Sequence, residues 1–225
     1  MPTAGRRPTA GRKRQGSGSD GAGTARHAAN AAEKRRIILD AAVRVFARQG
    51  FHTCRVSDIA DEAGVAYGLV YHYFDSKEEV LDTLFLERWE LLLAAIADVD
   101  ARDELSARDK LYEVASFIVD SYRHDPDLMK VIIVEVTRAA NSFGQTHLEQ
   151  IRRAYEGIAK IVVEGQESGA LRADVAPMFA SMAFYGAIEQ LLSGWIFELI
   201  PASEKDFEGA KGWVVETICA GIEPR

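Results

Sequence analysis

The sequence predicts an all-α protein of about nine helices, with an N-terminal helix–turn–helix unit and a C-terminal helical domain. Apolar residues recur at three- and four-residue spacing through most of the chain after residue 30. No segment shows the sustained two-residue alternation that is typical of a strand. Two short helical patterns, residues 56–63 and 67–74, are separated by a turn at Gly64, which is the arrangement of a helix–turn–helix.

Composition limits the class of protein. The 225 residues are 48% hydrophobic and 27% charged, which is ordinary for a globular chain of one large or two small domains. The two cysteines, Cys54 and Cys219, are far apart, and no Cys/His spacing suits a metal, so we expect no metal site and no cofactor. No apolar run reaches the roughly 20 residues of a membrane span, and the N-terminus has no secretory apolar core. We therefore expect a cytoplasmic protein that contacts no membrane.

Charge is distributed unevenly along the chain. Residues 1–32 contain six basic residues and one acid, which leaves 21 basic and 33 acidic residues, a net charge of −12, for the remainder. The same segment has almost no large apolar side chains, so we expect a disordered basic tail over residues 1–32. Two interpretations of this tail stay open, an arm that reaches DNA and a solvated segment without a specific role.

Capping signals place the long helices. The first is predicted over residues 33–49, with a capping-box pattern at Asn30 and Glu33 and a terminal glycine at Gly50. A fourth helix follows a capping box at Ser76 and carries an apolar stripe of five turns in which Arg88 also falls. Five more helices are expected after it, beginning at Ser106/Asp109, Asp125-Pro126, Thr146/Glu149, Asp174 and Ser203/Asp206.

The second short helix is unusually rich in aromatic and hydroxyl groups. Tyr67, Leu69, Tyr71, His72 and Tyr73 fall within seven residues. In a helix–turn–helix the second helix lies in the major groove while the first crosses the backbone. Because such a side-chain set suits a DNA groove better than a core, DNA binding is the leading hypothesis.

The stretch from Phe46 to Leu81 resembles the TetR family of bacterial transcriptional regulators. The matches are in register and cover under a quarter of the chain, and the helix order of the remainder is also similar to the family's. The matching positions are Phe46, Gly50, Phe51, Asp58, Ile59, Ala60, Ala63, Gly64, Val65, Gly68, Tyr71, Tyr73, Phe74, Ser76, Lys77, Glu78 and Leu81.

The resemblance implies a DNA-binding face and a domain organisation. It implies a helix–turn–helix domain over residues 33–78 and an effector-binding and dimerisation domain over residues 79–225. The positions implied to contact phosphates or base edges of a near-palindromic operator in double-stranded DNA are Arg55, Ser57, Tyr67, Gly68, Leu69, Tyr71, His72, Tyr73 and Lys77.

Three positions depart from the family pattern. Ala66 stands where a serine usually caps the second short helix, and a lost cap costs about 1 kcal/mol. Leu69 and Cys54 replace common threonines. Leu69 cannot donate a hydrogen bond, although it can meet a thymine methyl group. These departures weaken the transfer of individual contacts and leave the fold prediction unchanged.

The resemblance also implies a homodimer, formed through the last two helices, that releases DNA when a small hydrophobic effector binds. Short segments around residues 134–138 and 186–195 are similar to the branch of the family that responds to long-chain acyl-CoA, while a drug-like compound or another lipid remains an alternative. The candidate ligand-binding residues are Trp89, Phe117, Met129, Ile133, Val136, Arg138, Tyr155, Tyr185 and Glu189. Five basic residues are candidates for phosphate contacts at the mouth of this pocket: Arg123, Lys130, Arg138, Arg152 and Arg153.

Two other classes of function fit the sequence less well. An enzyme is disfavoured because the sequence has no Gly-rich phosphate loop, no metal-ligand spacing and no evident nucleophile–base pair. A helical interaction module that has lost DNA binding is conceivable because of Cys54, Ala66 and Leu69. DNA affinity with a steep salt dependence would exclude that module.

Overall fold

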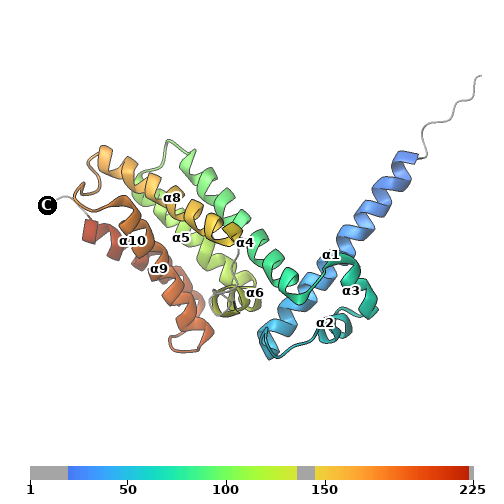
Figure 1. Ribbon diagram of the computed structural model, residues 1–225. Coiled ribbons are helices and arrows are strands. Elements are labelled where there is room, and N and C mark those ends of the chain that lie inside the picture. The colour runs from blue at the N-terminus through green and yellow to red at the C-terminus, as the bar shows by residue number, and fades with distance from the viewer. Residues whose placement is uncertain (1–19, 136–144, 223–225) are drawn as a thin grey trace, which may run out of the picture. The chain divides into compact units, whose positions relative to one another are not determined.

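A computed structural model describes residues 20–135 and 145–222. The chain divides into two units after Ile37, inside helix α1 (Asp20–Gln49), and the second unit, residues 38–225, contains the helix–turn–helix and all later helices. The described residues contain nine α-helices, one π-helical segment and no strand, which confirms the predicted all-α class (Figure 1). None of the described helices combines the length and the apolar character needed to cross a membrane.

Helix α1 begins earlier than predicted. It starts at Asp20 rather than near residue 33, so Asn30 lies inside the helix and caps nothing, and residues 20–32 are helical rather than disordered. The segment 20–32 contains six alanines, the residue with the highest helix propensity, and this preference outweighs its lack of apolar side chains. Residues 1–19 of the predicted tail lie outside the described residues.

Helices α2 (Val56–Ala63) and α3 (Tyr67–Tyr73) form the predicted helix–turn–helix. Gly64 ends α2 with φ at +65°, a left-handed conformation that glycine adopts without a steric cost. Phe46, Ile59 and Val70 are fully buried beneath the two helices and form the core of the helix–turn–helix. The helix–turn–helix is therefore held by its own small apolar core.

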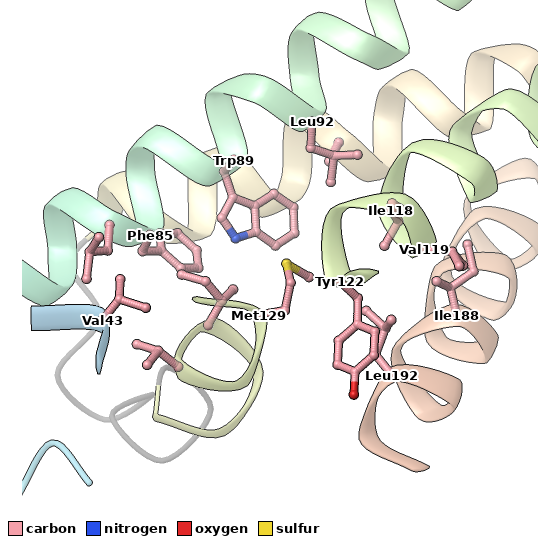
Figure 2. Packing of buried hydrophobic residues seen from close by; sticks show 14 of the residues in the cluster. Val43, Phe85, Trp89, Leu92, Ile118, Val119, Tyr122, Met129, Ile188 and Leu192 are labelled. Atoms are coloured by element: carbon pink, nitrogen blue, oxygen red, sulfur yellow. The ribbon is translucent and has the colours of Figure 1, made fainter. Parts of the chain in front are cut away.

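The remaining helices pack into one bundle. Helix α4 (Lys77–Asp100) packs on α5 (Ala107–His124) and α8 (Gln145–Glu167), and α8 packs on α9 (Pro177–Ile196). Helix α10 (Glu204–Ile222) packs on α5 and α9, and the short α6 (Pro126–Lys130) leads into a π-helical segment (Val131–Glu135) (Figure 1). The centre of the bundle is filled by large apolar side chains of α4, α5, α6 and α9, including Phe85, Trp89, Ile118, Met129 and Ile188 (Figure 2).

Most predicted helix starts agree with the structure. The Ser76 and Ser106 hydroxyls accept hydrogen bonds from backbone N–H groups three residues later, and Asp125 caps α6 with Pro126 at its first position. Asp174 was predicted to cap the ninth helix, but α9 begins at Pro177 instead. Asp174 forms an ion pair with Arg172, and the fixed φ of proline suits the first helical position.

Glu198 is a point of backbone strain after α9. Its φ of +56° places it in the left-handed region, and the flanking N–H groups of Glu198 and Leu199 bond to the carbonyls of Trp195 and Gly194. This is the hydrogen-bond pattern of a Schellman motif, in which glycine usually occupies the left-handed position.

We expect Glu198→Gly to stabilise the protein by about 1 kcal/mol, because glycine removes the steric cost of the left-handed conformation. Urea unfolding would measure the change. Glu198→Ala is the control, since alanine removes the carboxylate but keeps the strained Cβ. A stabilisation of the same size in both variants would locate the effect in the charge instead.

Candidate functional site

Two tyrosines dominate the surface of α3. Tyr67 is 54% exposed and Tyr71 is 43% exposed, and their rings meet edge to face with centroids 5.1 Å apart. The Tyr67 hydroxyl donates to the Tyr71 oxygen at 3.2 Å, which leaves the Tyr71 proton free to be donated outward. A tyrosine is protonated at neutral pH because the ordinary pKa of its phenol is about 10, so the Tyr71 hydroxyl is available there as a donor.

A hollow of about 460 Å³ lies beside these tyrosines. It brings together Arg55 and Ser57 at the start of α2, Tyr67 and Tyr71 on α3, and Lys77 at the start of α4. Helix N-termini and basic side chains are the groups that bind phosphate oxygens. The structure thus gathers five of the predicted DNA-binding residues at one concave surface, which Asp75 and Glu78 also border.

Lys77 has a structural role within this hollow. Its ammonium donates to the carbonyl oxygens of Phe51 at 2.7 Å and Cys54 at 3.0 Å, and it lies 4.6 Å from the centre of the Phe51 ring. These contacts tie the loop between α1 and α2 to the start of α4. An ammonium has three N–H groups, so one remains for a phosphate.

The other predicted DNA-binding positions lie on the same short helix. Gly68 and His72 are exposed, whereas Leu69 and Tyr73 are both partly buried, and Tyr73 packs against the core. The first turn of α3 has no side-chain cap, which confirms the lost cap expected from Ala66 at that position. The roles of these residues in DNA binding stay predictions.

We expect Tyr71→Phe to lower operator affinity by about three- to tenfold, because one hydrogen bond to phosphate is lost while the ring is kept. Competition in fluorescence anisotropy would measure it. Tyr112→Phe, at a tyrosine of similar exposure on α5, is the control. Equal affinities of the Tyr71→Phe variant and the wild type would mean that the Tyr71 hydroxyl does not contact DNA.

A second concave site lies between α4, α5 and α6. This outer cavity has a volume of about 570 Å³, within the range of small-molecule pockets. Its apolar lining comes from Leu91, Phe117, Leu128 and Met129. Its polar lining comes from Arg88, Glu113, Ser116, Asp120, Ser121, His124 and Asp125.

A smaller inner cavity adjoins it. Its volume is about 20 Å³, room for about one water molecule, and Arg88 and Met129 line both cavities. Trp89 and Tyr185 also line the inner cavity, with ring centroids 5.8 Å apart, and Figure 2 shows Met129 beside Trp89. The inner cavity is therefore too small to hold an acyl chain.

The structure brings together part of the predicted pocket. Phe117 lines the outer cavity, Trp89 and Tyr185 line the inner one, and Met129 lines both. The rings of Tyr155 and Tyr185 have centroids 5.6 Å apart. Burial raises the pKa of the Glu189 carboxyl. Ile133 packs against the core and lines neither cavity, and Val136 and Arg138 lie outside the described residues.

Arg88 is a binding candidate that the sequence did not single out. Its Nε donates to the Met129 sulfur at 3.4 Å, and its guanidinium lies 4.9 Å from the centre of the Phe117 ring. Burial lowers the pKa of Arg88. The signal in the sequence is a charged residue within the otherwise apolar stripe of the fourth predicted helix.

Other basic residues near the bundle are already engaged. Arg123 pairs with Asp120, Glu204 and Glu208, and Arg152 pairs with Glu149 and Glu156. Lys130 donates to the carbonyl oxygen of Ala47 at 2.9 Å, which links α6 to the last turn of α1. The basic mouth expected for phosphate contacts is therefore largely committed to contacts within the chain.

Comparison with known proteins decides the family. Residues 38–84 match the family described as "Bacterial regulatory proteins, tetR family", and residues 108–218 match the one described as "Tetracyclin repressor-like, C-terminal domain". The two matches together span more than half of the chain. The chain belongs to the TetR family. The resemblance seen in Phe46–Leu81 is confirmed, and the TetR-family relatives are transcriptional regulators rather than enzymes.

Several relatives of this TetR-family chain are named for fatty acid metabolism. A fatty acid metabolism regulator protein of Bacillus subtilis is 30% identical over 186 residues, which cover 82% of this chain and 93% of that protein. The structure of the fatty acid degradation regulator FadR from Bacillus halodurans is similar with a TM-score of 0.76 and 25% identity, covering 85% and 97% of the two chains. The structure of FadR from Bacillus subtilis in complex with stearoyl-CoA is similar with a TM-score of 0.74 and 28% identity, covering 84% of this chain and 99% of that chain.

Proposed function

We propose that this TetR-family protein is a homodimeric repressor that binds a near-palindromic operator and is released by a small hydrophobic effector. The observation that carries the proposal is the pairing of two sites. An exposed tyrosine pair lies on α3 beside Lys77, and an apolar cavity lies beside α6, which contacts α1 through Lys130.

Dimer formation is supported by exposed apolar side chains on the last two helices. Phe179 and Met182 on α9 are 68% and 52% exposed, and Trp213 on α10 is 62% exposed. Large exposed aromatic and methionine side chains are typical of protein interfaces. A two-fold dimer through this face would present two copies of α3, and half-sites about one turn of DNA apart, or a small multiple, would match them.

The effector is proposed to be a lipid-like molecule. Long-chain acyl-CoA is the first candidate, because a related structure is a complex with stearoyl-CoA and the cavity between α4, α5 and α6 has an apolar lining. A different lipid or a drug-like compound is the second candidate. The engagement of Arg123 and Arg152 in ion pairs favours this second candidate, since a CoA phosphate would have to displace their carboxylate partners.

Selection from fragmented DNA of the encoding genome tests the DNA-binding part of the proposal. The purified protein should enrich a few fragments that share a near-palindrome, and affinity for a duplex of that sequence should fall steeply with salt. Enrichment of no sequence would leave the helical interaction module as the better explanation.

We expect Lys130→Met to bind operator and effector normally but to respond less to the effector. The Lys130–Ala47 hydrogen bond joins the cavity wall to α1, so its loss should reduce the ligand-induced change in operator affinity to within about threefold, from the roughly 5- to 150-fold common for allosteric coupling. Anisotropy with and without oleoyl-CoA would measure the ratio. Lys205→Met, at an exposed lysine of α10, is the control; equal ratios in both variants would exclude this route.

A further inference from the structure

Arg88 is a partly buried cation whose hydrogen-bonding capacity is largely unused. A guanidinium has five N–H donors, whereas the acceptor that Arg88 meets among the described residues is the thioether of Met129, a weak acceptor. No described carboxylate lies within 4 Å of its nitrogens. Taking a charge out of water without a counter-ion is costly, so this position favours a negatively charged ligand.

The acids of the outer cavity do not serve as counter-ions for Arg88. Asp120 pairs with Lys211 and Arg123, and the Asp125 carboxylate accepts the backbone N–H of Leu128. Glu113 lies 3.7 Å from Arg102. Each acid thus has a partner of its own, and Arg88 is a cation of the lining that lacks a carboxylate partner among the described residues.

A second donor points to the same ligand chemistry. The Ser116 hydroxyl, in the lining of the outer cavity, is buried and has no hydrogen-bond partner among the described residues. The neighbouring Ser121 hydroxyl is already used, because it donates to the carbonyl of Phe117 at 2.6 Å. A guanidinium and a free hydroxyl in one apolar cavity form a donor set without a matching acceptor.

We propose that the outer cavity binds an amphiphile with a single carboxylate, which Arg88 holds while the chain covers Phe117, Leu128 and Met129. This inference rests on the proposed effector response and, through the charge of the head group, selects the second candidate above, a lipid other than an acyl-CoA. A carboxylate supplies both the counter-charge and two acceptors for the planar guanidinium, whereas a thioester carbonyl supplies one uncharged acceptor. The acidic rim of Glu113, Asp120 and Asp125 disfavours the additional negative charges of a phosphorylated head group.

Binding of such a ligand would replace the contact between Arg88 and the Met129 sulfur. Met129 lies in α6 next to Lys130, whose ammonium holds the Ala47 carbonyl of α1. The carboxylate would therefore act on the segment that joins the cavity to the DNA-binding unit. Arg88 is then the residue that distinguishes one head group from another.

Calorimetric titration without DNA tests the proposal with four probes that share one chain: dodecanoate, dodecanol, dodecylamine and dodecanoyl-CoA, the first three below their micelle or solubility limits. The wild type should bind dodecanoate at least about tenfold more tightly than dodecanol, and dodecylamine most weakly. Arg88→Met should weaken dodecanoate about 10- to 100-fold, as expected for a lost charged hydrogen bond, and dodecanol less than about threefold. Arg108→Met, an ion-paired arginine outside the cavity, is the matched control.

Several results would overturn the proposal. Equal affinity of the wild type for dodecanol and dodecanoate would do so. Dodecanoate affinity that is unchanged in Arg88→Met would do so as well. Binding of dodecanoyl-CoA that depends on Arg88, with no binding of dodecanoate, would assign the site to a thioester instead. If Arg88→Met does not fold, Arg88→Lys keeps the charge and should retain the preference for dodecanoate over dodecanol. Because no DNA is present, failure here is distinct from failure of the repressor proposal.

Discussion

Trp213→Glu is expected to convert the protein to a monomer at micromolar concentration and to lower operator affinity more than about 100-fold. Trp213 is 62% exposed on α10, so the substitution should change the stability of the single chain by no more than about 0.5 kcal/mol. In a two-fold dimer each substitution occurs twice, and a buried tryptophan at an interface commonly contributes about 2 kcal/mol or more. A charge at that position adds a desolvation cost to the lost contact.

The loss of DNA affinity follows from the loss of the second reading head. Two linked heads bind adjacent half-sites with an effective concentration that a free monomer does not have. Sedimentation velocity and anisotropy on the selected operator would measure the two effects. Leu148→Glu, at a leucine of α8 that is 53% exposed, is the matched control and should stay dimeric. A Trp213→Glu protein that remains dimeric would place the interface elsewhere.

Lys77→Met is expected to destabilise the helix–turn–helix by roughly 2–4 kcal/mol, because two charge-assisted hydrogen bonds to backbone carbonyls are lost. The carbonyls of Phe51 and Cys54 would then lack the donor that fixes the loop before α2. Operator affinity should fall as well, through the displaced loop and through any phosphate contact of the third N–H group. Urea unfolding and anisotropy together separate these two contributions.

Lys77→Arg is the informative comparison for this residue. Arginine keeps the charge for phosphate, but its planar fork does not reproduce the position of the ammonium between two carbonyls and above the Phe51 ring. We expect it to restore part of the DNA affinity and little of the stability. Full stability of Lys77→Met would mean that the two carbonyl contacts contribute nothing to the fold.

The parts of the fold that depend on local signals could be predicted from the sequence. Gly64 marked the turn, and Ser76, Ser106 and Asp125 marked helix starts, because a cap or a left-handed glycine is a property of a few neighbouring residues. The prediction of a helix start at Asp174 was wrong because a second local signal, Pro177 three residues later, sets the start of α9. Helix α1 began early because a run of alanines forms helix without an apolar stripe.

The cavity that we propose for the effector could be predicted only in part, because it is a long-range feature. Trp89, Met129 and Tyr185 meet across three helices, and their spacing along the chain does not encode that contact. The role proposed for Arg88 depends on what surrounds it, namely a thioether and an aromatic ring rather than a carboxylate. In the sequence, Arg123 and Arg152 were as suitable as Arg88 for binding an anion. Only the carboxylate partners of Arg123 and Arg152 in the folded chain distinguish them from Arg88.

The most direct test is to select DNA fragments of the encoding genome with the purified protein and to sequence them. The selection is then repeated with dodecanoate and with oleoyl-CoA. We predict that a few fragments sharing one near-palindrome are enriched by the protein alone and that at least one of the two amphiphiles abolishes this enrichment. Fragments bound without a common sequence, or an enrichment that neither amphiphile changes, would contradict a repressor that a lipid-like effector releases from its operator.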